Sequence, residues 1–506
     1  MRSCIWFYDS SSILRITMKV FNSDFEGACS MNKRETLNKS LKPSWVWAIA
    51  FGSSIGWGAF ILPADWIGQS GSLGAIIGLL LGALVMILIA VSYGVLIKKY
   101  PVSGGEYAYA FVSSGKYWAF VTGWFLSLGY ISIVALNASA FSLLLKYLFP
   151  KFMKTIYLYK IAGWEVFLPE IVISSIIILL FAYLNIKGTG TSGRLQYVFS
   201  IILIIGVVVM GIFTFLYADM PMNNMKPMFA ENQSMLKSII VILAVAPWAY
   251  VGFNNVPQAA EEFKFSPRKA SGLIVMSLIS SGLVYATMIG VTSWTYASDQ
   301  AMNSSKLWLT GDIIHSSFGL VGVIILVLAI CMGIFTGLNG FFHSSSRLLF
   351  AMSRAKALPP MFSDIHPVHK TPHKSIWFIA FLTLPTAWFG REALLWIVDM
   401  SSTGVSVAYF FTCFAAFKFL AWSQNENGLE VSPLKKAIAF IGAIFSIGFL
   451  MLLLTPGSPA QLQTPSFIAL IVWIVLGFIF FITMIREYSG YTKNELDYYI
   501  FGEEEK

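Results

Sequence analysis

Charged residues are scarce in this sequence of 506 residues. Asp, Glu, Lys and Arg together make up 12% of the chain, whereas soluble domains contain about 25%. Apolar residues make up 57%, and the mean hydropathy is +0.72. This composition excludes an ordinary soluble domain and predicts an integral membrane protein with the lipid bilayer as its surroundings.

Cysteine and histidine are also rare, with four and five residues. Cys4 and Cys29 lie near the N-terminus, whereas Cys331 and Cys413 lie in apolar segments. This distribution fits neither a disulfide framework nor a metal cluster. The apolar segments carry no clustered His, Asp, Cys or Ser constellation, which disfavours an enzyme. We therefore expect no catalytic residues, no metal site and no cofactor.

Apolar segments recur along the whole chain instead. They favour membrane helices over barrel strands, which would show alternating segments of about ten residues. The pattern predicts an all-α integral membrane protein with 12 transmembrane helices. The predicted spans are roughly 44–68, 73–97, 117–149, 168–186, 195–217, 236–260, 270–295, 319–353, 375–390, 392–419, 436–454 and 467–485.

Positive charge is distributed unevenly between the predicted loops. If the N-terminus is cytoplasmic, the inner segments carry 26 of the 34 Lys and Arg residues and the outer loops carry 8. This bias follows the positive-inside rule, although the outer loop with Lys146, Lys151, Lys154 and Lys160 runs against it. We predict a multi-pass protein of the cell (cytoplasmic) membrane with both termini cytoplasmic. The net charge of +9 is then explained by the Lys and Arg residues of the cytoplasmic segments, and no nucleic-acid partner is expected.

Two predicted spans contain helix-breaking residues. The first carries GSSIGWGAFILP at 52–63, and the sixth carries Pro247, Gly252 and Pro257. Glycines four residues apart also serve close helix packing. We interpret the glycines of the second span in this way. Breaks in both the first and the sixth span favour two halves of five helices that build a site near the middle of the membrane.

The predicted halves divide the chain into four regions. A cytoplasmic tail covers 1–43, of which 1–30 are expected to be dispensable because they hold neither a span nor a cleavable signal. The first five helices cover 44–219 and the next five cover 236–419. Residues 420–506 then hold helices 11 and 12 and the cytoplasmic C-terminus.

Interrupted helices expose backbone groups that can bind charge without a charged side chain. A half-helix that begins near Gly58 presents free N–H groups and the positive end of its dipole, which suit a carboxylate. Half-helices that end near Ser54 and Pro247 leave free carbonyls, which suit an ammonium group. Adjacent sites for both groups predict an α-amino acid as the ligand.

Several motifs resemble those of a known family. They are GSSIGWGAFILPA in the first span, YPVSGGEYAYAF (100–111), GKYWAFVTGW (115–124), NIKGTGTSGRLQ (185–196), PWAYVGFNNVPQAAEEFKFSPRKA (247–270) and GLNGFFHSSSRLLFAMSRAKALPP (337–360). Over about 44–485, the sequence resembles the amino acid, polyamine and organocation (APC) superfamily in its bacterial amino acid permease branch. The resemblance implies a five-plus-five inverted repeat with broken helices 1 and 6 and two additional C-terminal helices. It also implies a secondary active transporter.

By position, the resemblance implies nine substrate-binding residues in the two interrupted spans. Three would bind the substrate carboxylate through backbone amides, three would bind its amine through carbonyls, and three would shape the side-chain pocket. In that order they are Gly56, Trp57 and Gly58; Ser54, Trp248 and Val251; and Ala249, Phe253 and Asn254. Trp248 would also be the aromatic gate.

Two positions depart from the family pattern. Trp57 stands where a small residue is frequent, and Asn254 stands where an acidic residue is common. Because no charged side chain is evident at the inferred pocket, we expect a neutral amino acid, moved by alternating access as uptake or exchange. An amine or polyamine carrier and a non-transporting nutrient receptor are the alternative functions.

No coupling device is evident in the sequence. Asn339 and Gly340 stand where sodium-coupled relatives place a Ser or Thr pair, and 195–217 contain no Lys, Arg or His. Proton symport, facilitated uptake and exchange therefore remain open, with a proton as the candidate co-transported ion. The oligomeric state is not determined by these patterns.

Charged residues at the inner ends of two spans are interpreted as structural. Glu261 and Glu262 are expected to form a cytoplasmic cap with Lys264, Arg268 or Lys269. His343 lies one turn before Arg347, and we interpret it as a packed or hydrated histidine rather than a proton relay.

Overall fold

The structure is a computed structural model. It describes residues 37–502 except 162, 219, 232, 296–307, 391, 427–431 and 459–460. Most of the predicted tail, including all of residues 1–30, therefore lies outside the described residues. The chain from Leu37 onward forms one unit.

Nine helices in the described part of the chain are long and apolar enough to cross a membrane. Most of their ends lie within a few residues of the predicted spans. The exceptions are the polar first turns that begin at Thr189, the last turns that continue to Glu426 and a kinked extension that begins at Leu309. These long helices are α5 (Ser72–Lys99), α7 (Lys116–Leu148), α9 (Leu168–Ile186), α10 (Thr189–Tyr217), α15 (Ala270–Thr295), α17 (Leu309–Arg354), α19 (Glu392–Glu426), α20 (Pro433–Leu454) and α21 (Thr464–Gly490).

The three remaining predicted spans correspond to interrupted helices. The first consists of α2 (Pro43–Ile55), α3 (Gly58–Ile61) and α4 (Pro63–Ser70), and the sixth consists of α12 (Met235–Leu243), α13 (Ala246–Ala249) and α14 (Asn255–Gln258). The ninth continues from α18 (His373–Thr383) into the 3₁₀ helix η4 (Leu384–Phe389). The predicted breaks in the first and sixth spans are thus confirmed.

A kink divides the longest helix. Gly319 in α17 has φ 61° and ψ −154°, a backbone conformation outside the helical region that side chains rarely permit. The part after this kink matches the predicted eighth span, which begins at 319. The preceding turns, from Leu309, are an addition that the apolar pattern did not predict.

Short elements connect the long helices. They are α6 (Gly105–Ser114), α8 (Pro150–Met153), α11 (Pro221–Asn224), α22 (Lys493–Phe501), and the 3₁₀ helices η1 (Ala260–Glu262), η2 (Pro267–Lys269) and η3 (Pro360–Ser363). One antiparallel hairpin pairs β1 (Tyr157–Ile161) with β2 (Trp164–Phe167). The all-α prediction therefore needs one small correction, because the aromatic and β-branched residues of this loop favour strands.

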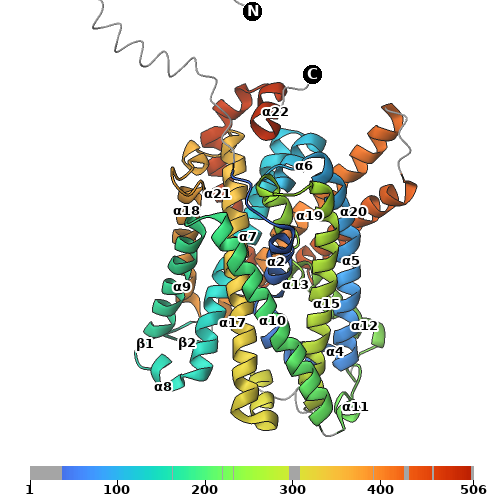
Figure 1. The fold of residues 1–506 in the computed structure, drawn as a ribbon, viewed down its shortest axis with the longest axis vertical. Coiled ribbons are helices and arrows are strands. Elements are labelled where there is room, and N and C mark those ends of the chain that lie inside the picture. Colours follow the sequence, from blue (N-terminus) through green and yellow to red (C-terminus); the bar gives the residue numbers. More distant parts are fainter. Residues whose placement is uncertain are drawn as a thin grey trace, which may run out of the picture. The chain divides into compact units, whose positions relative to one another are not determined.

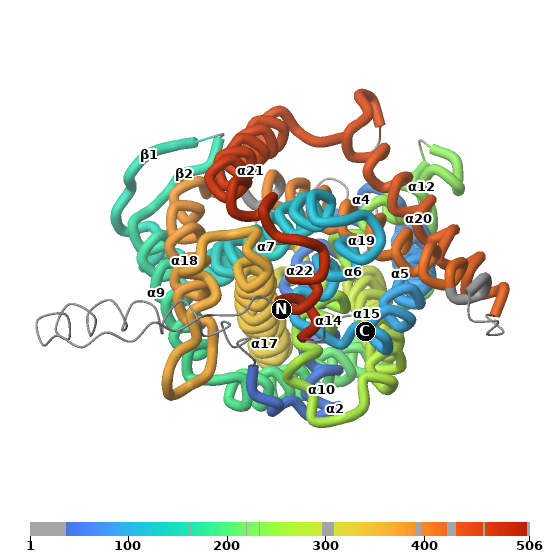
Figure 2. Tube along the Cα trace, turned by 90° about the horizontal axis from the view of Figure 1, so that it is seen from above, coloured from blue at the N-terminus to red at the C-terminus, as the bar shows by residue number. Residues whose placement is uncertain are grey.

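Interrupted helix α2 lies among the long helices and contacts α10, α15 and α17. Figure 1 shows α2 and α13 at about mid-height among these helices. The last two long helices, α20 and α21, are less enclosed, and Figure 2 shows both toward the edge of the bundle. The two breaks therefore lie inside the bundle, where other protein groups surround their exposed backbone.

Candidate functional site

The first break is a two-residue interruption between α2 and α3. The helix α2 ends at Ile55, and α3 begins at Gly58, as the sequence predicted. Between them, Gly56 has φ 50° and ψ −143°, whereas Trp57 keeps helical angles. Only glycine adopts this combination readily, so the turn of the chain is concentrated at one residue.

The second break is longer and runs from Tyr250 to Asn254, between α13 and α14. Pro247 was expected to end a half-helix, but it lies in the first turn of α13. A proline is tolerated in a first turn because the amide that it lacks has no intrahelical partner there. The positive φ of Gly252, 133°, marks the actual turn of the chain.

The two breaks lie in direct contact. A Cβ at Gly252 would lie 2.5 Å from the backbone nitrogen of Ser54 and 2.7 Å from the carbonyl carbon of Ser53, so only glycine permits this approach. The hydroxyl of Ser54 lies 3.1 Å from the carbonyl oxygen of Tyr250, to which it can donate. The backbones of two segments almost 200 residues apart in sequence thereby form one site.

The predicted tryptophans also meet at this site. The rings of Trp57 and Trp248 pack edge to face with centroids 5.9 Å apart. A Cβ at Gly58 would lie 2.7 Å from the far edge of the Trp248 ring. The ring of Trp248 therefore covers the beginning of α3, which is the position expected for an aromatic gate.

Three backbone amides at the beginning of α3 donate no hydrogen bond to the described residues. They belong to Trp57, Gly58 and Ala59, whereas the Gly56 amide donates a long bond of 3.3 Å to the carbonyl of Gly52. Unpaired amides at a helix beginning carry the positive end of the helix dipole and suit an anion. A bare glycine surface at residue 58 leaves these amides accessible to a ligand once the Trp248 ring moves.

Carbonyls on the other side of the breaks are partly engaged by Tyr285 of α15. Its hydroxyl lies 2.9 Å from the carbonyl oxygen of Ser54 and 2.8 Å from that of Ala249. Because a tyrosine hydroxyl has one proton, it donates to one of them at a time. The carbonyl of Trp248 accepts from the amide of Val251 at 3.2 Å, whereas that of Val251 accepts no hydrogen bond from the described residues.

The last two predicted residues lie against other helices. Phe253 stacks on Tyr409 of α19, with ring centroids 5.5 Å apart, and meets the edge of Tyr93 of α5 at 5.2 Å. The side-chain oxygen of Asn254 accepts from the Gly252 amide at 3.1 Å. The structure thus brings the residues of the first break to Trp248, Ala249 and Val251, but it places Phe253 and Asn254 on the α5 and α19 side of the second break.

Asn137 of α7 is a site residue that the sequence prediction missed. Its side-chain oxygen lies 3.5 Å from a Cβ position at Gly56, is buried, and has no hydrogen-bond partner among the described residues. Its side-chain nitrogen donates to the carbonyl of Ile133 at 2.9 Å. An amide side chain in an apolar span is a signal that could have identified it.

Neutral donors, rather than a charged group, engage the carbonyls of α2 next to the first break. Gln196 of α10 lies within 3.3 Å of the carbonyl of Ala48, and the hydroxyl of Thr336 can donate to that of Gly52 at 2.9 Å or to that of Gly333 in its own helix at 2.8 Å. Asn339 of α17 donates to the side-chain oxygen of Gln196 at 2.7 Å. A cation bound to these carbonyls would have to compete with both donors.

At one end of the bundle, a buried ion pair joins Glu262 of η1 to α17. Its carboxylate lies 3.0 Å from the guanidinium of Arg347 and 2.8 Å from the ring of His343. Burial by itself would raise the pKa of Glu262, but the positive charge of Arg347, together with His343, lowers it to about 2. His343 is therefore packed against a carboxylate, which agrees with its predicted structural role.

The predicted partners of this acidic pair were wrong. Glu262 contacts Arg347, and Glu261 contacts Arg354 at 2.6 Å, rather than the Lys and Arg residues that follow in sequence. Only the tertiary structure brings the end of α17 beside η1. The backbone of Glu262 also accepts from the amides of Ser40 and Leu41 at 2.9 Å each, which ties the segment before α2 to the same place.

At the other end, Trp308 closes over α3. Its indole N–H donates to the carbonyl of Phe60 at 3.0 Å, and its ring meets the edge of Tyr147 at 5.0 Å. The hydroxyl of Tyr147 donates to Asp312 at 2.7 Å. The breaks therefore lie between two sets of contacts, one toward each end of α17.

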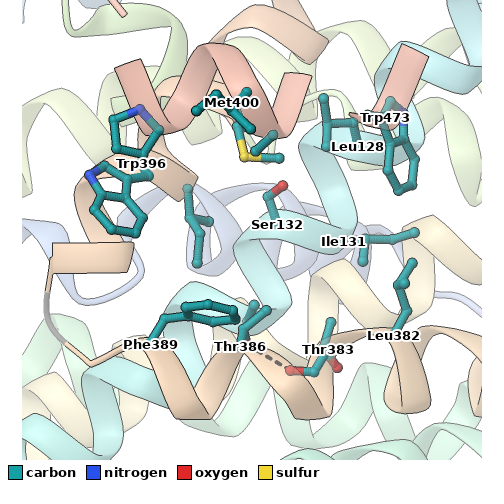
Figure 3. A pocket seen from close by; sticks show the side chains of 15 residues that line it. Leu128, Ile131, Ser132, Leu382, Thr383, Thr386, Phe389, Trp396, Met400 and Trp473 are labelled. Atoms are coloured by element: carbon teal, nitrogen blue, oxygen red, sulfur yellow. Dashed lines mark hydrogen bonds between the residues drawn. The ribbon is translucent and has the colours of Figure 1, made fainter. Parts of the chain in front are cut away.

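An apolar cavity of about 400 Å³ lies away from the breaks, between α7, α18 with η4, α19 and α21 (Figure 3). Residues such as Met400, Trp396 and Phe389 line it, and its polar side chains are Ser132, Thr383 and Thr386. None of the nine predicted site residues lies in its wall. An apolar wall without charged groups does not suit an amino acid, so the breaks remain the candidate site.

Comparisons with known proteins show which family the sequence matches. A family described as amino acid permease matches residues 42–480. The methylthioribose transporter of Bacillus subtilis (strain 168) is 26% identical over 92% of this chain and 97% of its own length. The branched-chain amino acid permease BcaP of Lactococcus lactis subsp. cremoris is 24% identical over 79% and 86%. The serine/threonine exchanger SteT of Bacillus subtilis is 25% identical over 81% and 91%.

The contact between the breaks predicts a strong effect of Gly252→Ala. The added Cβ would meet backbone atoms of Ser53 and Ser54 in a conformation that alanine rarely adopts. We expect the free energy of unfolding to fall by about 1–3 kcal/mol, a typical cost of such strain. Thermal unfolding of the purified protein measures it. Gly272→Ala is the matched control, because nothing lies within 4 Å of its Cβ position, and equal melting temperatures for both variants would contradict the contact.

The buried pair predicts that Arg347→Gln destabilises the protein by about 3–5 kcal/mol, because the buried carboxylate of Glu262 loses its main partner. Lys374→Gln removes a pair with Asp364 that is 47% exposed, and surface pairs contribute about 0–1 kcal/mol. Melting temperatures of the two variants should therefore differ clearly. Because the pKa of Glu262 is depressed, its ionised form contributes to the stability of the folded protein at pH values above 4.5. This contribution is lost as the pH falls from 4.5 toward 2.

Proposed function

This chain belongs to the amino acid permease family, and we propose that it moves a neutral amino acid across the cell membrane by alternating access. The proposal depends mainly on one observation: the amides of Trp57, Gly58 and Ala59 have no hydrogen-bond partner among the described residues, and the ring of Trp248 lies over Gly58, the middle residue of the three. Together they form a site for a carboxylate that needs no cationic side chain.

The nine predicted residues, together with the amide of Ala59, constitute the proposed substrate site. The three free amides support the carboxylate end, and the open carbonyl of Val251 supports the ammonium end. Carbonyls shared by Tyr285 become available when its single proton turns to another acceptor. No charged side chain takes part in these contacts, which favours an uncharged substrate side chain.

We also propose the predicted membrane arrangement. The nine long helices and the three interrupted ones would make twelve crossings, with two five-helix repeats in 44–219 and 236–419 and the last two helices in 420–506. The distribution of Lys and Arg supports cytoplasmic termini and insertion in the cell membrane. In this arrangement the 1–43 tail and the Glu262 pair lie on the cytoplasmic side.

Alternating access follows from the two sets of closing contacts. On the proposed cytoplasmic side, the Glu262–Arg347 pair holds the end of the sixth span against α17. On the opposite side, Trp308 holds α3 through the carbonyl of Phe60. Opening one set while the other stays closed would expose the breaks to one side of the membrane at a time.

The methylthioribose relative supports a second candidate substrate class, a neutral thiosugar. Such a molecule has no carboxylate to bind the free amides at Trp57 and Gly58, and for this reason we prefer an amino acid. Amines and polyamines are less favoured, because they have no carboxylate to bind the free amides; the carboxylate nearest the second break, Glu106, is engaged by Gln258 and Tyr130. A receptor without transport would bind the substrate but show no flux.

Uptake into proteoliposomes tests the proposal directly. We expect neutral L-amino acids to accumulate or exchange, and their methyl esters and N-acetyl derivatives to compete at least about 100-fold more weakly. Each derivative loses a charged group that would make at least two charge-assisted hydrogen bonds, and two such bonds at about 1.5–3 kcal/mol each correspond to a factor of about 100 or more. The panel includes methylthioribose, putrescine and arginine.

Each outcome of this panel is informative. Uptake of methylthioribose with no amino acid flux would replace the proposed substrate. Equal competition by the free amino acid and its ester would exclude the free amides as the carboxylate site. Binding without flux, detected as a rise in melting temperature on substrate addition, would indicate a receptor.

A side chain at residue 58 should block the site. In Gly58→Val, the new Cβ would both cover the free amides and meet the Trp248 ring at 2.7 Å, so uptake should be abolished. Substrate should also no longer raise the melting temperature. Gly448→Val on α20 is the control, because nothing lies within 4 Å of its Cβ position. A Gly58→Val protein that binds and transports like the wild type would refute the proposed site.

A further inference from the structure

A buried carboxylate without a cationic partner lies next to the second break. Glu106 of α6 is 0% exposed, and no Lys, Arg or His nitrogen of the described residues lies within 4.0 Å of its carboxylate. One oxygen accepts from the side-chain amide of Gln258 of α14 at 2.5 Å. The other lies 3.4 Å from the hydroxyl of Tyr130 of α7. The proposed substrate site does not use this residue.

The groups around Glu106 are neutral. Its titratable neighbours are tyrosines, and α14 contributes only amides. They are Tyr93 on α5, Tyr109 on α6, Tyr130 on α7 and Tyr409 on α19. The basic side chains of α17, which also packs on α6, are paired elsewhere: His343 and Arg347 with Glu262, and Arg354 with Glu261.

Burial among neutral groups penalises the charged form of Glu106. It raises the pKa of this carboxyl to about 7, and hydrogen bonding, first from its own backbone and then from side chains that include Gln258, only partly offsets the effect. The group thus gains and loses its proton in the physiological range. Glu262, by contrast, stays ionised there because Arg347 compensates its charge.

Tyr130 connects the charge of Glu106 to the backbone of the second break. Its single hydroxyl proton has two possible acceptors, the carbonyl oxygen of Asn254 at 3.0 Å and the Glu106 carboxylate at 3.4 Å. An ionised carboxylate is the stronger acceptor, whereas a protonated one competes poorly. Asn254 directly precedes α14, so the choice of acceptor decides whether Tyr130 holds α14 to α7.

Further polar groups lie between the break and Glu106. The hydroxyls of Tyr93 and Tyr409, the side-chain nitrogen of Asn254 and the side-chain oxygen of Gln258 are buried and have no hydrogen-bond partner among the described residues. The two tyrosine hydroxyls can both accept and donate and can therefore relay a proton, whereas the amide nitrogen only donates and the amide oxygen only accepts. Because Tyr93 of α5 and Tyr409 of α19 contact the ring of Phe253, these groups connect the second break with the surroundings of Glu106.

We propose that Glu106 is the proton-binding residue that couples transport to a proton gradient, with Tyr130 and α14 as the element that responds. The inference rests on the proposed transport function. A proton from the outer solution would form the O–H bond of the carboxylic acid, and the Tyr130 hydroxyl would then donate to the Asn254 carbonyl. Release of this proton to the cytoplasm would restore the carboxylate, which draws the Tyr130 hydroxyl away, so that α14 loses its contact with α7 and is held to α6 through Gln258 instead. One proton would cross with one neutral substrate, so uptake would be electrogenic.

The test compares proton-driven accumulation with exchange in proteoliposomes. Glu106→Gln preserves the side-chain shape but cannot titrate. We expect it to lose accumulation driven by an imposed pH gradient, and to lose the dependence of exchange on pH near 7, while labelled substrate still exchanges and still raises the melting temperature. Asp364→Asn, which removes a half-exposed carboxylate paired with Lys374, should behave like the wild type.

Other outcomes separate the inference from the proposed function. A Gln variant that accumulates substrate like the wild type would overturn the role of Glu106. A Gln variant that loses both substrate binding and exchange would also overturn it, because this result would indicate that Glu106 binds a cationic substrate. Wild-type exchange that ignores a pH gradient would overturn the coupling and leave the transport function standing. If the Gln variant fails to fold, Glu106→Asp must shift the pH midpoint of uptake, and an unchanged midpoint would exclude the proposal.

Discussion

The contact between the two helix breaks is the constraint on which the rest of the structure depends. A chain in lipid must satisfy its backbone groups internally, yet α2–α3 and α13–α14 leave several of them open inside the bundle. Gly252 allows one break to touch the other at Ser53 and Ser54, and the Ser54 hydroxyl bonds to Tyr250 across this contact. Groups that would destabilise a continuous membrane helix thus become the polar lining of a shared site.

The surrounding helices hold these open groups in place without neutralising all of them. Tyr285, Gln196 and Thr336 satisfy carbonyls next to the breaks through neutral donors. The amides at Trp57 and Gly58 remain without a partner among the described residues. The consequence is a site that has a direction, with donors at one end and acceptors at the other, as a zwitterion requires. Its selectivity against other molecules would arise from this geometry rather than from a charged side chain.

Two buried carboxylates near the sixth span illustrate how burial and pairing determine charge. Glu262 has Arg347 and His343 beside it and remains ionised, so it acts as a fixed closing contact. Glu106 has only amide and hydroxyl neighbours and changes its charge near neutral pH. The difference lies in the partner helix, since α17 supplies cations to η1, whereas α7 and α14 supply only neutral donors to α6. In the proposed transport cycle, the first residue would stabilise a closed state and the second would respond to protons.

The membrane class, nearly all span positions and the two breaks could be predicted from the amino-acid sequence, because apolar run length and the placement of Gly and Pro are local properties. The breaks at Gly56 and near Gly252 follow from this local chemistry, and with them most of the candidate site. The partners of Glu261 and Glu262 and the roles of Asn137, Tyr285 and Glu106 were decided only by the tertiary structure. An ordinary tyrosine or glutamate in the sequence does not reveal which helix it will face. That information arises only when helices distant in sequence pack together, because burial and partner choice set the charge and hydrogen bonding of each side chain.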